Sequence, residues 1–356
     1  MAPTSDAAAR AGDATAPPVP SPARGRRAPE CFDDPHFLAA TREMQALGLR
    51  VMAIAHAGSA PFDAVAGRMQ LRWYLLPAGP RAVSVASLAL MQPLRRRARI
   101  GKRIMTGAAR LSLPHLWRRS RVHVSGTNRL AALFGPGTAH AAFLTGTAGP
   151  HRKLAVQFMD DSGVIRGYAK VARTPAAQEL LANEAATLAA LRDLDLRAAM
   201  VPRLLLHERR DGVAVLATDA ARAQHAPCRA RLERAHIAFL DELAKRTAAS
   251  APDGDALLDG LRAKVRRLPA SLTDAWRQRF DRSLRELARA PELVAPRGLA
   301  HGDLMPGNLF RYEDRVYVFD WEYAGYDYPA DYDLIRFAFA AEALRHRASI
   351  DRCRAV

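Results

Sequence analysis

The sequence predicts an α+β fold of two lobes, in which a small antiparallel sheet precedes a helix-rich region. Residues 138–172 hold three short apolar segments separated by glycine-containing turns, which is typical of an antiparallel meander. Residues 228–293 show strong apolar patterns at helical spacing. The length of 356 residues, 49% of them hydrophobic and 25% charged, suits a globular protein of one large or two modest domains.

The N-terminal part of the chain divides into a tail and a small module. Residues 1–29 are rich in alanine and proline and lack apolar periodicity, so we expect a disordered tail that is not a secretory signal. Apolar spacing then predicts a helix over 35–47, which Gly48 ends, and a strand over 51–55. The segments MQLRWYLLP and RAVSVASLAL flank a turn-rich PAGP and predict a hairpin. These elements make residues 30–125 a predicted α+β module.

A basic segment ends this module. Ten Lys and Arg residues and no acidic residue lie between positions 91 and 121. Within the segment, apolar residues at helical spacing predict an amphipathic basic helix, namely Ile100, Ile104, Ala108 and Leu111. Two interpretations stay open: peripheral contact with an anionic membrane through residues 95–119, or the favoured one, a packed helix with a solvated cationic face. Nucleic acid is a poorer partner, because the segment lacks interleaved aromatic residues apart from Trp117.

The three apolar segments from residue 138 lead into a predicted helix. Thr174 stands at its N-cap position and Pro175 at its first position, and apolar residues at helical spacing follow. Two more apolar runs, PRLLLHE and GVAVLATDA, predict strands that complete the sheet. We therefore predict a sheet lobe over residues 138–220 and a helix-rich lobe over residues 221–356.

Charge and cysteine usage indicate a compartment and a class of ligands. The chain has 53 Lys and Arg against 36 Asp and Glu, and the net charge of +17 suggests a phosphate-bearing ligand, anionic lipid or nucleic acid. Cys31, Cys228 and Cys353 are far apart, so neither a disulfide framework nor a zinc site is expected. Because no stretch of 18 apolar residues occurs, we expect a cytoplasmic protein that is at most peripheral to the inner face of the membrane.

The chemistry-bearing stretch is residues 299–334. Asp303 and Asn308 are separated by a Pro-Gly loop, and a strand–turn–strand pattern then predicts a hairpin that brings Asp320 back toward Asn308. Carboxylate and amide oxygens are the hard ligands that Mg2+ takes beside substrate phosphates. This layout indicates phosphoryl transfer.

The runs HGDLMPGNLF and VYVFDWEYAG resemble the catalytic-loop and metal-binding motifs of the aminoglycoside phosphotransferase and choline kinase superfamily. The resemblance covers roughly residues 138–345 and also includes a following Asp-Leu. It implies a two-lobed protein-kinase-like fold, with ATP as phosphate donor and Mg2+ as cofactor. A protein kinase is disfavoured, because only twelve residues separate Asp320 from Asp333 and no long activation segment fits there.

The resemblance also implies roles for the loop residues. Asp303 would orient the acceptor hydroxyl and take its proton, while Asn308 and Asp320 would hold Mg2+ against the ATP phosphates. His301 would brace the loop and would not act as a base. Asp333 would hydrogen-bond the catalytic loop from the start of a helix.

In the sheet lobe the resemblance implies the nucleotide contacts. Lys170 on the third strand would contact the α and β phosphates of ATP. Its ion-pair partner would be Glu184 in the middle of the following helix, with Glu179 as a competitor. The loop from Gly146 to Gly149 would cover the phosphates with backbone amides, although it departs from the protein-kinase glycine pattern.

The remaining positions keep alternatives. Residues 216–219 would form the hinge that contacts adenine. Glu322 would add an outer ligand to the metal site or contact the substrate. Tyr323, Tyr326 and Tyr328 would form part of an aromatic box for a quaternary ammonium group, or would pack against the last helix.

Taken as an enzyme, the chain would move the γ-phosphate of Mg-ATP to a hydroxyl of a small molecule, with choline, ethanolamine, a sugar or an amino sugar as candidates. The alternative is a non-catalytic nucleotide-binding regulator or membrane-associated scaffold of the same fold. Intact motif residues favour the enzyme. Only 23 residues follow Asp333, so we expect an acceptor pocket that is reduced, or completed by the N-terminal module or a second subunit.

Overall fold

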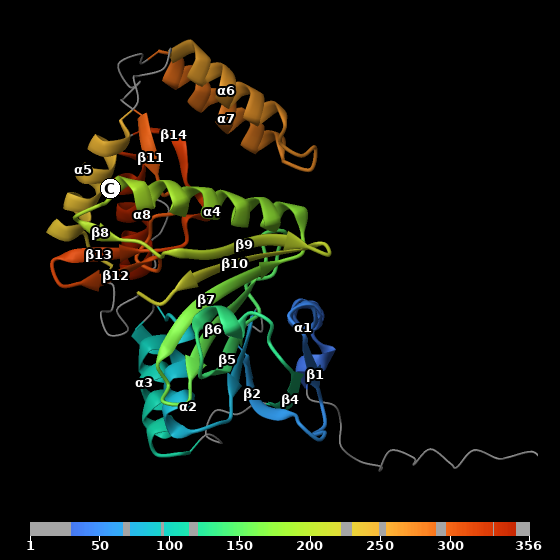
Figure 1. Ribbon diagram of the computed structural model, residues 1–356. Helices are drawn as coiled ribbons and strands as arrows, with labels where there is room; N and C mark the ends of the chain where they lie inside the picture. Colours follow the sequence, from blue (N-terminus) through green and yellow to red (C-terminus); the bar gives the residue numbers. More distant parts are fainter. Residues whose placement is uncertain are drawn as a thin grey trace, which may run out of the picture.

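The computed structural model has two lobes, a large antiparallel sheet with short helices and a smaller helix-rich part (Figure 1). It describes residues 30–66, 72–93, 96–113, 120–221, 230–248, 254–289, 297–329 and 331–346. The predicted N-terminal tail, Trp117, Cys228 and the chain from residue 347 onward lie outside the described residues. The predicted α+β class is confirmed.

One antiparallel sheet of nine strands runs through the first lobe in the order β1-β4-β2-β3-β5-β6-β7-β10-β9. The predicted meander is β5, β6 and β7, and the two further predicted strands are β9 and β10. The strands span Leu49–Met52 (β1), Ala60–Ala66 (β2), Trp73–Pro77 (β3), Ser120–Gly126 (β4), Thr138–Leu144 (β5), Leu154–Asp160 (β6), Ile165–Ala172 (β7), Leu204–Arg210 (β9) and Val213–Asp219 (β10).

The N-terminal strands and the meander belong to the same sheet. β3 pairs with β5, with Tyr74 opposite Leu144 and Leu75 opposite Phe143. A buried cluster that includes Leu75 and Phe143 packs against Phe37 of helix α1, Pro35–Ala46, which is the predicted N-terminal helix. The segments predicted as separate units therefore share one sheet and one core, and their division into domains stays a prediction.

The predicted hairpin around residues 77–80 is wrong in its second arm. β3 is its first arm, but the second arm is helix α2, Arg81–Ser87, followed by a 3-10 turn, Leu88–Leu90. Val83 and Ser87 are both fully buried. Residues four positions apart lie on one face of a helix and also on one face of a strand, so this pattern fits both elements. Both edges of β3 are already occupied, by β2 and β5, so no edge is left for another strand.

Register across the sheet separates two faces. Leu75, Phe143, Val156, Ala169 and Ala217 stand opposite one another on successive strands and belong to the core cluster beneath α1. The adjacent row points to the other face, because successive side chains of a strand alternate. This row consists of Tyr74, Leu144, Ala155, Lys170 and Leu216, and it faces the cleft between the lobes.

The helix-rich lobe carries the catalytic-loop motif between short strands. Its main core includes the fully buried side chains of Phe239, Trp321 and Phe337. The lobe comprises α4 (Pro175–Leu194), α5 (Arg234–Thr247), α6 (Gly254–Arg266), α7 (Asp274–Ala288), α8 (Tyr332–His346), β8 (Ala199–Met200), β11 (Arg297–Ala300), β12 (Leu309–Tyr312), β13 (Arg315–Val318) and β14 (Gly325–Pro329). The predicted helix after Thr174 and the predicted hairpin, now β12 and β13, are confirmed.

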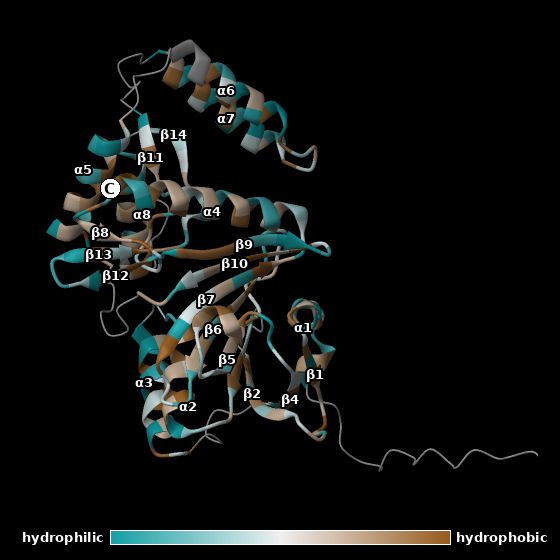
Figure 2. Cartoon of the chain, in the orientation of Figure 1, coloured by the Kyte–Doolittle hydropathy of each residue, from teal (hydrophilic) through white to brown (hydrophobic). Residues whose placement is uncertain are grey.

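The predicted basic helix is α3, Arg96–Arg110, on which hydrophilic and hydrophobic residues lie side by side (Figure 2). The helix packs near α2 through Ala108 and Ala109, the two side chains of α3 that are buried. Ile100 and Ile104 are 47% and 62% exposed, and Leu111 just beyond the helix is 71% exposed. The helix is therefore packed on one side, as the favoured interpretation expects, but Ala108 is the one member of the predicted stripe that is buried, and Ala109 and the half-buried Met105 contribute the rest of the contact.

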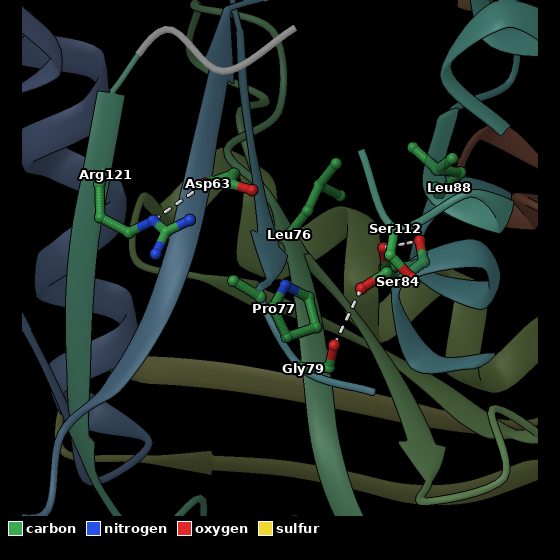
Figure 3. A pocket seen from close by; sticks show the side chains of 11 residues that line it. Asp63, Leu76, Pro77, Gly79, Ser84, Leu88, Ser112 and Arg121 are labelled. Atoms are coloured by element: carbon green, nitrogen blue, oxygen red, sulfur yellow. Dashed lines mark hydrogen bonds and ion pairs between the residues drawn. The ribbon is translucent and has the colours of Figure 1, made fainter. Parts of the chain in front are cut away.

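None of the helices in the described part of the chain combines the length and apolar character needed to cross a bilayer. A cavity of about 270 Å3 lies between the β2–β3 pair and helices α2 and α3 (Figure 3). Its wall includes the ion pair of Arg121 Nε with Asp63 Oδ1 at 3.1 Å, and a hydrogen bond from Ser84 to the carbonyl of Gly79. This cavity is built from N-terminal residues and is separate from the motif residues.

Candidate active site

The loop between β11 and β12 is braced by His301. Its side chain is fully buried, contacts Trp321 with the two rings tilted by 42° and their centroids 4.7 Å apart, and accepts a hydrogen bond at Nδ1 from the Asp303 amide at 3.3 Å. Nε2 then carries the proton and donates to the Phe319 carbonyl at 2.9 Å. Both ring nitrogens are thus engaged with backbone, which agrees with a bracing role.

Asp333, in the first turn of α8, holds the same loop. Its carboxylate accepts from the amides of His301 at 2.6 Å and Gly302 at 3.1 Å. Burial raises the pKa of Asp333 above its usual range. Gly302 has φ +78°, and a Cβ there would lie 2.1 Å from the Tyr323 carbonyl oxygen, so only glycine fits at this position.

The Asp303 carboxylate is held from two sides. The Asn308 side-chain amide donates to the Asp303 carbonyl at 2.9 Å and to Oδ2 at 3.3 Å, and the Arg336 guanidinium pairs with Oδ1. Sequence reasoning missed Arg336. Its spacing could have indicated it: Arg336 follows Asp333 by three residues, so the two lie on the same face of helix α8.

Lys170 and Glu184 form the predicted ion pair. Lys170 Nζ donates to both carboxylate oxygens of Glu184, at 2.8 and 2.6 Å, and also contacts the Asp320 carboxylate. The competitor, Glu179, is exposed, whereas Glu184 is buried. Burial alone would lower the pKa of Lys170, but the carboxylates of Asp320, Glu184 and Glu322 outweigh it and raise that pKa.

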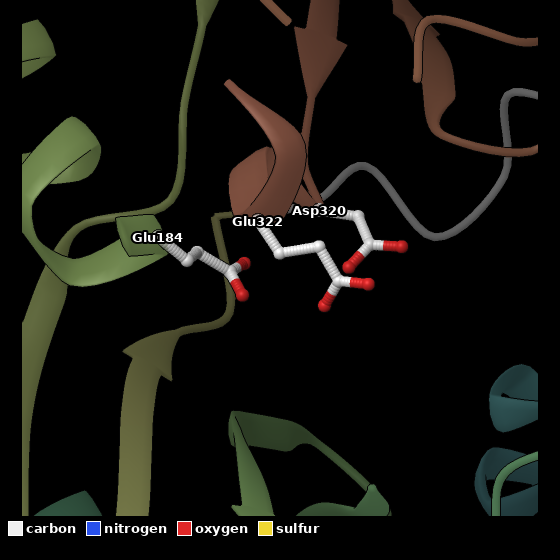
Figure 4. A group of neighbouring side chains, drawn as sticks. All are labelled: Glu184, Asp320 and Glu322. Carbon is white, nitrogen blue, oxygen red and sulfur yellow. The ribbon is translucent and has the colours of Figure 1, made fainter. Parts of the chain in front are cut away.

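The carboxylates around Lys170 differ in their ionisation. Burial raises the pKa of Glu184 although Lys170 opposes the shift. Burial would also raise the pKa of Asp320, but the nearby Lys170 ammonium outweighs it and lowers that pKa. Oxygen atoms of Glu184, Asp320 and Glu322 lie within 4.8 Å of one another, and Figure 4 shows the Glu184 side chain from α4 converging on Asp320 and Glu322, which share one turn.

Glu322 pairs with Lys153, a contact that sequence reasoning missed. The Lys153 ammonium contacts Glu322 Oε2, which also lies 4.0 Å from Lys170 Nζ. The side chain of Asn183 on α4 donates to the Glu322 and Ala324 carbonyls at 3.0 and 2.9 Å. These bonds fasten the helix that carries Glu184 to the turn that carries Glu322.

A cleft of about 420 Å3 lies between the sheet and the helix-rich lobe. Lys170, Glu184, Asn308 and Asp320 all line it, and so do Leu216 and Thr218 of the predicted hinge. The volume falls in the range of small-ligand sites. The Asp320 carboxylate and the Asn308 amide offer the hard oxygen donors that suit Mg2+.

The glycine loop lines a neighbouring cavity instead of this cleft. Residues 146–153 enclose about 400 Å3 together with Glu322 and Tyr323. Gly146 has φ +73°, and a Cβ there would lie 2.3 Å from the Lys153 carbonyl oxygen, so the loop closes tightly on itself. Among the described residues that line the cleft beside Lys170, neither Gly146 nor Gly149 is found.

The N-terminal helix anchors this loop. Both terminal nitrogens of Arg152 donate to the buried Glu43 carboxylate of α1, at 2.9 and 2.6 Å, and one also donates to the Thr145 carbonyl at 3.2 Å. Planar two-point pairing of this kind fixes orientation as well as distance. No sequence pattern indicated this pair, because the partners stand 109 positions apart.

The three tyrosines of the expected aromatic box do not stack on one another, although the Tyr328 hydroxyl donates to the Tyr323 carbonyl at 3.4 Å. Tyr323 hydrogen-bonds His151 through its hydroxyl at 2.9 Å, Tyr328 packs on Tyr332 with centroids 4.4 Å apart, and Tyr326 is 52% exposed. The alternative, packing against the last helix, holds for Tyr328. Trp321 is fully buried in the core of the lobe.

Comparison with known proteins gives one family and several solved structures. The model of the phosphotransferase enzyme family matches residues 144–355. No curated protein sequence matches the chain.

The solved structures that resemble this chain are distant from it in sequence. Aminoglycoside 2'-phosphotransferase-IIIa in its GDP complex is 13% identical, with a TM-score of 0.40 over 62% of this chain and 81% of that one. Spectinomycin phosphotransferase APH(9)-Ia with ADP and spectinomycin is 15% identical, with a TM-score of 0.34 over 61% and 77%. The amicoumacin kinase hAmiN is 14% identical, with a TM-score of 0.33 over 56% and 64%.

Proposed function

The chain belongs to the phosphotransferase enzyme family, and we propose on that basis that it is a small-molecule kinase that transfers the γ-phosphate of ATP to an acceptor hydroxyl. The observation that carries the proposal is the convergence at one cleft of Lys170, Glu184, Asn308 and Asp320. Choline, ethanolamine, a sugar and an amino sugar are the candidate acceptors.

In this proposal Asp303 accepts the proton of the acceptor hydroxyl. Asn308 and Arg336 hold its two carboxylate oxygens in place, which fixes the orientation of the base. Lys170 binds the phosphates of the nucleotide, with Glu184 fixing its position. Gly146 and Gly149 line the neighbouring cavity with Lys153 and Glu322, so a contact of this loop with the phosphates would have to come from that side of Glu322.

Asp320 and Asn308 are the residues that would hold Mg2+. When bound, the ion neutralises developing charge on the transferring phosphate. Glu322 lies close to this proposed Mg2+ position, because its carboxylate oxygen lies within 4.8 Å of oxygens of Asp320 and Glu184. Its pairing with Lys153 ties this acidic cluster to the glycine loop.

Calorimetric titration with ATP, in the presence of Mg2+ and again with EDTA, tests the nucleotide part of the proposal. We expect binding with Mg2+ and a clear loss of affinity with EDTA, because the acidic cluster repels an uncompensated triphosphate. ADP release with each of the four candidate acceptors then identifies the acceptor. A folded sample that binds no ATP would contradict the proposal.

The same experiment separates the enzyme from a non-catalytic regulator. A regulator binds Mg-ATP but releases no ADP with any acceptor, whereas the enzyme releases ADP with at least one. Asp303 favours the enzyme, because a proton acceptor would be dispensable in a protein that only binds nucleotide, whereas Lys170, Asn308 and Asp320 would serve Mg-ATP binding in either case.

For cellular placement we propose a cytoplasmic protein whose α3 contacts anionic membrane. The exposed Ile100, Ile104 and Leu111 give α3 an apolar stripe, and exposed arginines flank it. A helix of this kind lies in the lipid interface with its cations at the headgroups, and each cation contributes about 1 kcal/mol there. Because the exposed face of α3 is cationic, we propose lipid with anionic headgroups as its partner.

Co-sedimentation with vesicles tests this contact. We expect the wild-type protein to bind vesicles containing phosphatidylglycerol, and not phosphatidylcholine alone, and the Arg97→Ser/Arg103→Ser variant to lose roughly 2 kcal/mol of binding. The control is Arg282→Ser/Arg285→Ser on α7, which removes the same charge from another exposed helix. Equal binding of both double variants would eliminate the lipid contact.

A further inference from the structure

Lys153 provides a second ammonium group close to that of Lys170. Its Nζ contacts Glu322 Oε2, and the same oxygen lies 4.0 Å from Lys170 Nζ. One carboxylate oxygen is thus within ion-pair distance of two ammonium groups. The Lys153 side chain is only 12% exposed, yet it lines the cavity of about 400 Å3 that the glycine loop encloses. A nearly buried cation that faces a cavity of this size is suited to bind an anionic group there.

Strand register places Lys153 on the face of the sheet that meets the cleft. Lys153 directly precedes β6, and Ala155, two residues later, stands opposite Lys170 on β7. Leu154 between them belongs to the core cluster on the other face. Because side chains of an extended segment alternate between faces, Lys153 shares the face of Ala155 and Lys170. The two lysines therefore approach the acidic cluster from adjacent strands.

The order of the strands shows at which end of the cleft Lys153 lies. β10 carries Leu216 and Thr218, in the segment expected to contact adenine, and its neighbour β7 carries Lys170. The next strand in the same direction is β6, which Lys153 precedes. Adenine segment, Lys170 and Lys153 thus follow one another across the sheet. With Lys170 at the α and β phosphates, the phosphate nearest to Lys153 is the terminal one.

The residue before Lys153 fixes its backbone. Arg152 donates to both carboxylate oxygens of Glu43, and with 11% and 1% of these side chains exposed the pair is nearly buried. Arg152 also donates to the Thr145 carbonyl at the start of the loop, and the Thr145 amide donates to the carbonyl of Trp73 on β3 at 2.9 Å. Glu43 and Trp73 both precede the segment that the family model matches. The N-terminal part of the chain therefore sets where Lys153 stands.

We propose that Lys153 binds the γ-phosphate of the nucleotide and that the Glu43–Arg152 pair positions it. An ammonium group has three N–H donors, so Lys153 can keep its contact with Glu322 and donate to a phosphate oxygen as well. A cation held in place at the transferring phosphate stabilises the charge that develops there. Lys153 is then a catalytic residue, and Glu43 and Arg152 are positioning residues. This inference rests on the proposed function.

The test compares Mg-ATP with Mg-ADP, which lacks the γ-phosphate. Calorimetry measures both affinities for the wild-type chain and for Lys153→Met. We expect the substitution to lower the affinity for Mg-ATP about tenfold and to leave that for Mg-ADP within twofold, because one charge-assisted hydrogen bond to the γ-phosphate is lost. Lys245→Met is the matched control, at an exposed lysine that pairs with Asp241, and it should change neither affinity.

A second substitution separates lost binding from repulsion. Lys153→Met removes the closer of the two ammonium groups beside Glu322, and the remaining carboxylate charge repels a triphosphate more than a diphosphate. Glu322→Gln and Lys153→Met/Glu322→Gln both lack this charge, and between them the tenfold loss of Mg-ATP affinity should persist. The double variant also serves if Lys153→Met alone does not fold. Equal Mg-ATP affinity of these two variants would overturn the γ-phosphate contact.

Glu43→Gln tests the positioning pair. It keeps the size of the side chain but removes the charge that holds Arg152, so the ratio of Mg-ATP to Mg-ADP affinity should fall roughly threefold. The same change in a Lys153→Met background should lower the ratio no further, because Glu43 acts through Lys153. Arg152→Gln breaks the pair from the other side and should behave alike. Equal losses of affinity for both nucleotides would make the pair merely structural and overturn its positioning role.

The wild-type titrations keep this inference apart from the proposed function. Wild-type protein that binds neither nucleotide overturns the proposed function itself. Wild-type protein that binds Mg-ATP, together with a Lys153→Met variant of unchanged Mg-ATP affinity, overturns only the assignment of Lys153.

Discussion

Replacing Asp303 with Asn is expected to reduce phosphoryl transfer by about 10²–10⁴-fold while leaving the affinity for Mg-ATP unchanged. The amide keeps the size of the carboxylate but cannot accept the acceptor's proton. Nucleotide binding should persist, because Lys170, Asn308 and Asp320 line the cleft and Asp303 is not among its lining residues. The measurements are the initial rate of ADP release and a calorimetric titration with Mg-ATP.

Asp314→Asn is the matched control. It makes the same chemical change in the exposed turn between β12 and β13, eleven positions along the chain, and it should leave the rate of ADP release within twofold of wild type. If Asp303→Asn retains wild-type activity, Asp303 is not the base. If it loses ATP affinity as well, its role is structural, through its contact with Asn308.

Replacing Lys170 with Met is expected to have the largest combined effect on stability and binding. Met retains most of the side-chain volume but removes the ammonium that lies between Glu184 and Asp320. Three carboxylates then remain within 4.8 Å, and Lys153 is the ammonium group that still pairs with one of them, Glu322. Leaving a buried charge without its partner costs about 3 kcal/mol, which urea unfolding would measure. Affinity for Mg-ATP should fall roughly 10–100-fold with the lost phosphate contact.

A rescue variant separates these two effects. Lys170→Met/Glu184→Gln neutralises the most buried carboxylate and should recover most of the stability, but it should not recover affinity for Mg-ATP. Lys245→Met is the control, because Lys245 pairs with Asp241 one helical turn away with 73% of its side chain exposed. Exposed pairs contribute less than about 1 kcal/mol. A rescue variant with wild-type affinity would show that Lys170 does not bind the phosphates.

Local patterns were sufficient for most elements of the matched region. The meander, the helix capped by Thr174 and the β12–β13 hairpin are all where their turns and periodicity predict, because each rests on contacts between neighbouring residues. The choice of Glu184 over Glu179 also followed from local pattern, since its apolar neighbours place it on the inner helix face. Segment 81–90 is the exception, because its spacing suits both a helix and a strand.

The sequence by itself determined the class of the fold, the phosphotransferase motifs and the identity of the residues that those motifs contain. Only the tertiary structure decided that β3 extends the same sheet, that Arg152 pairs with Glu43, that Arg336 holds Asp303, and that Tyr74 and Gln92 line the cleft. The physical reason is sequence distance. Periodicity and turn residues report contacts a few positions apart, whereas strand pairing and ion pairs between distant segments depend on how the whole chain packs.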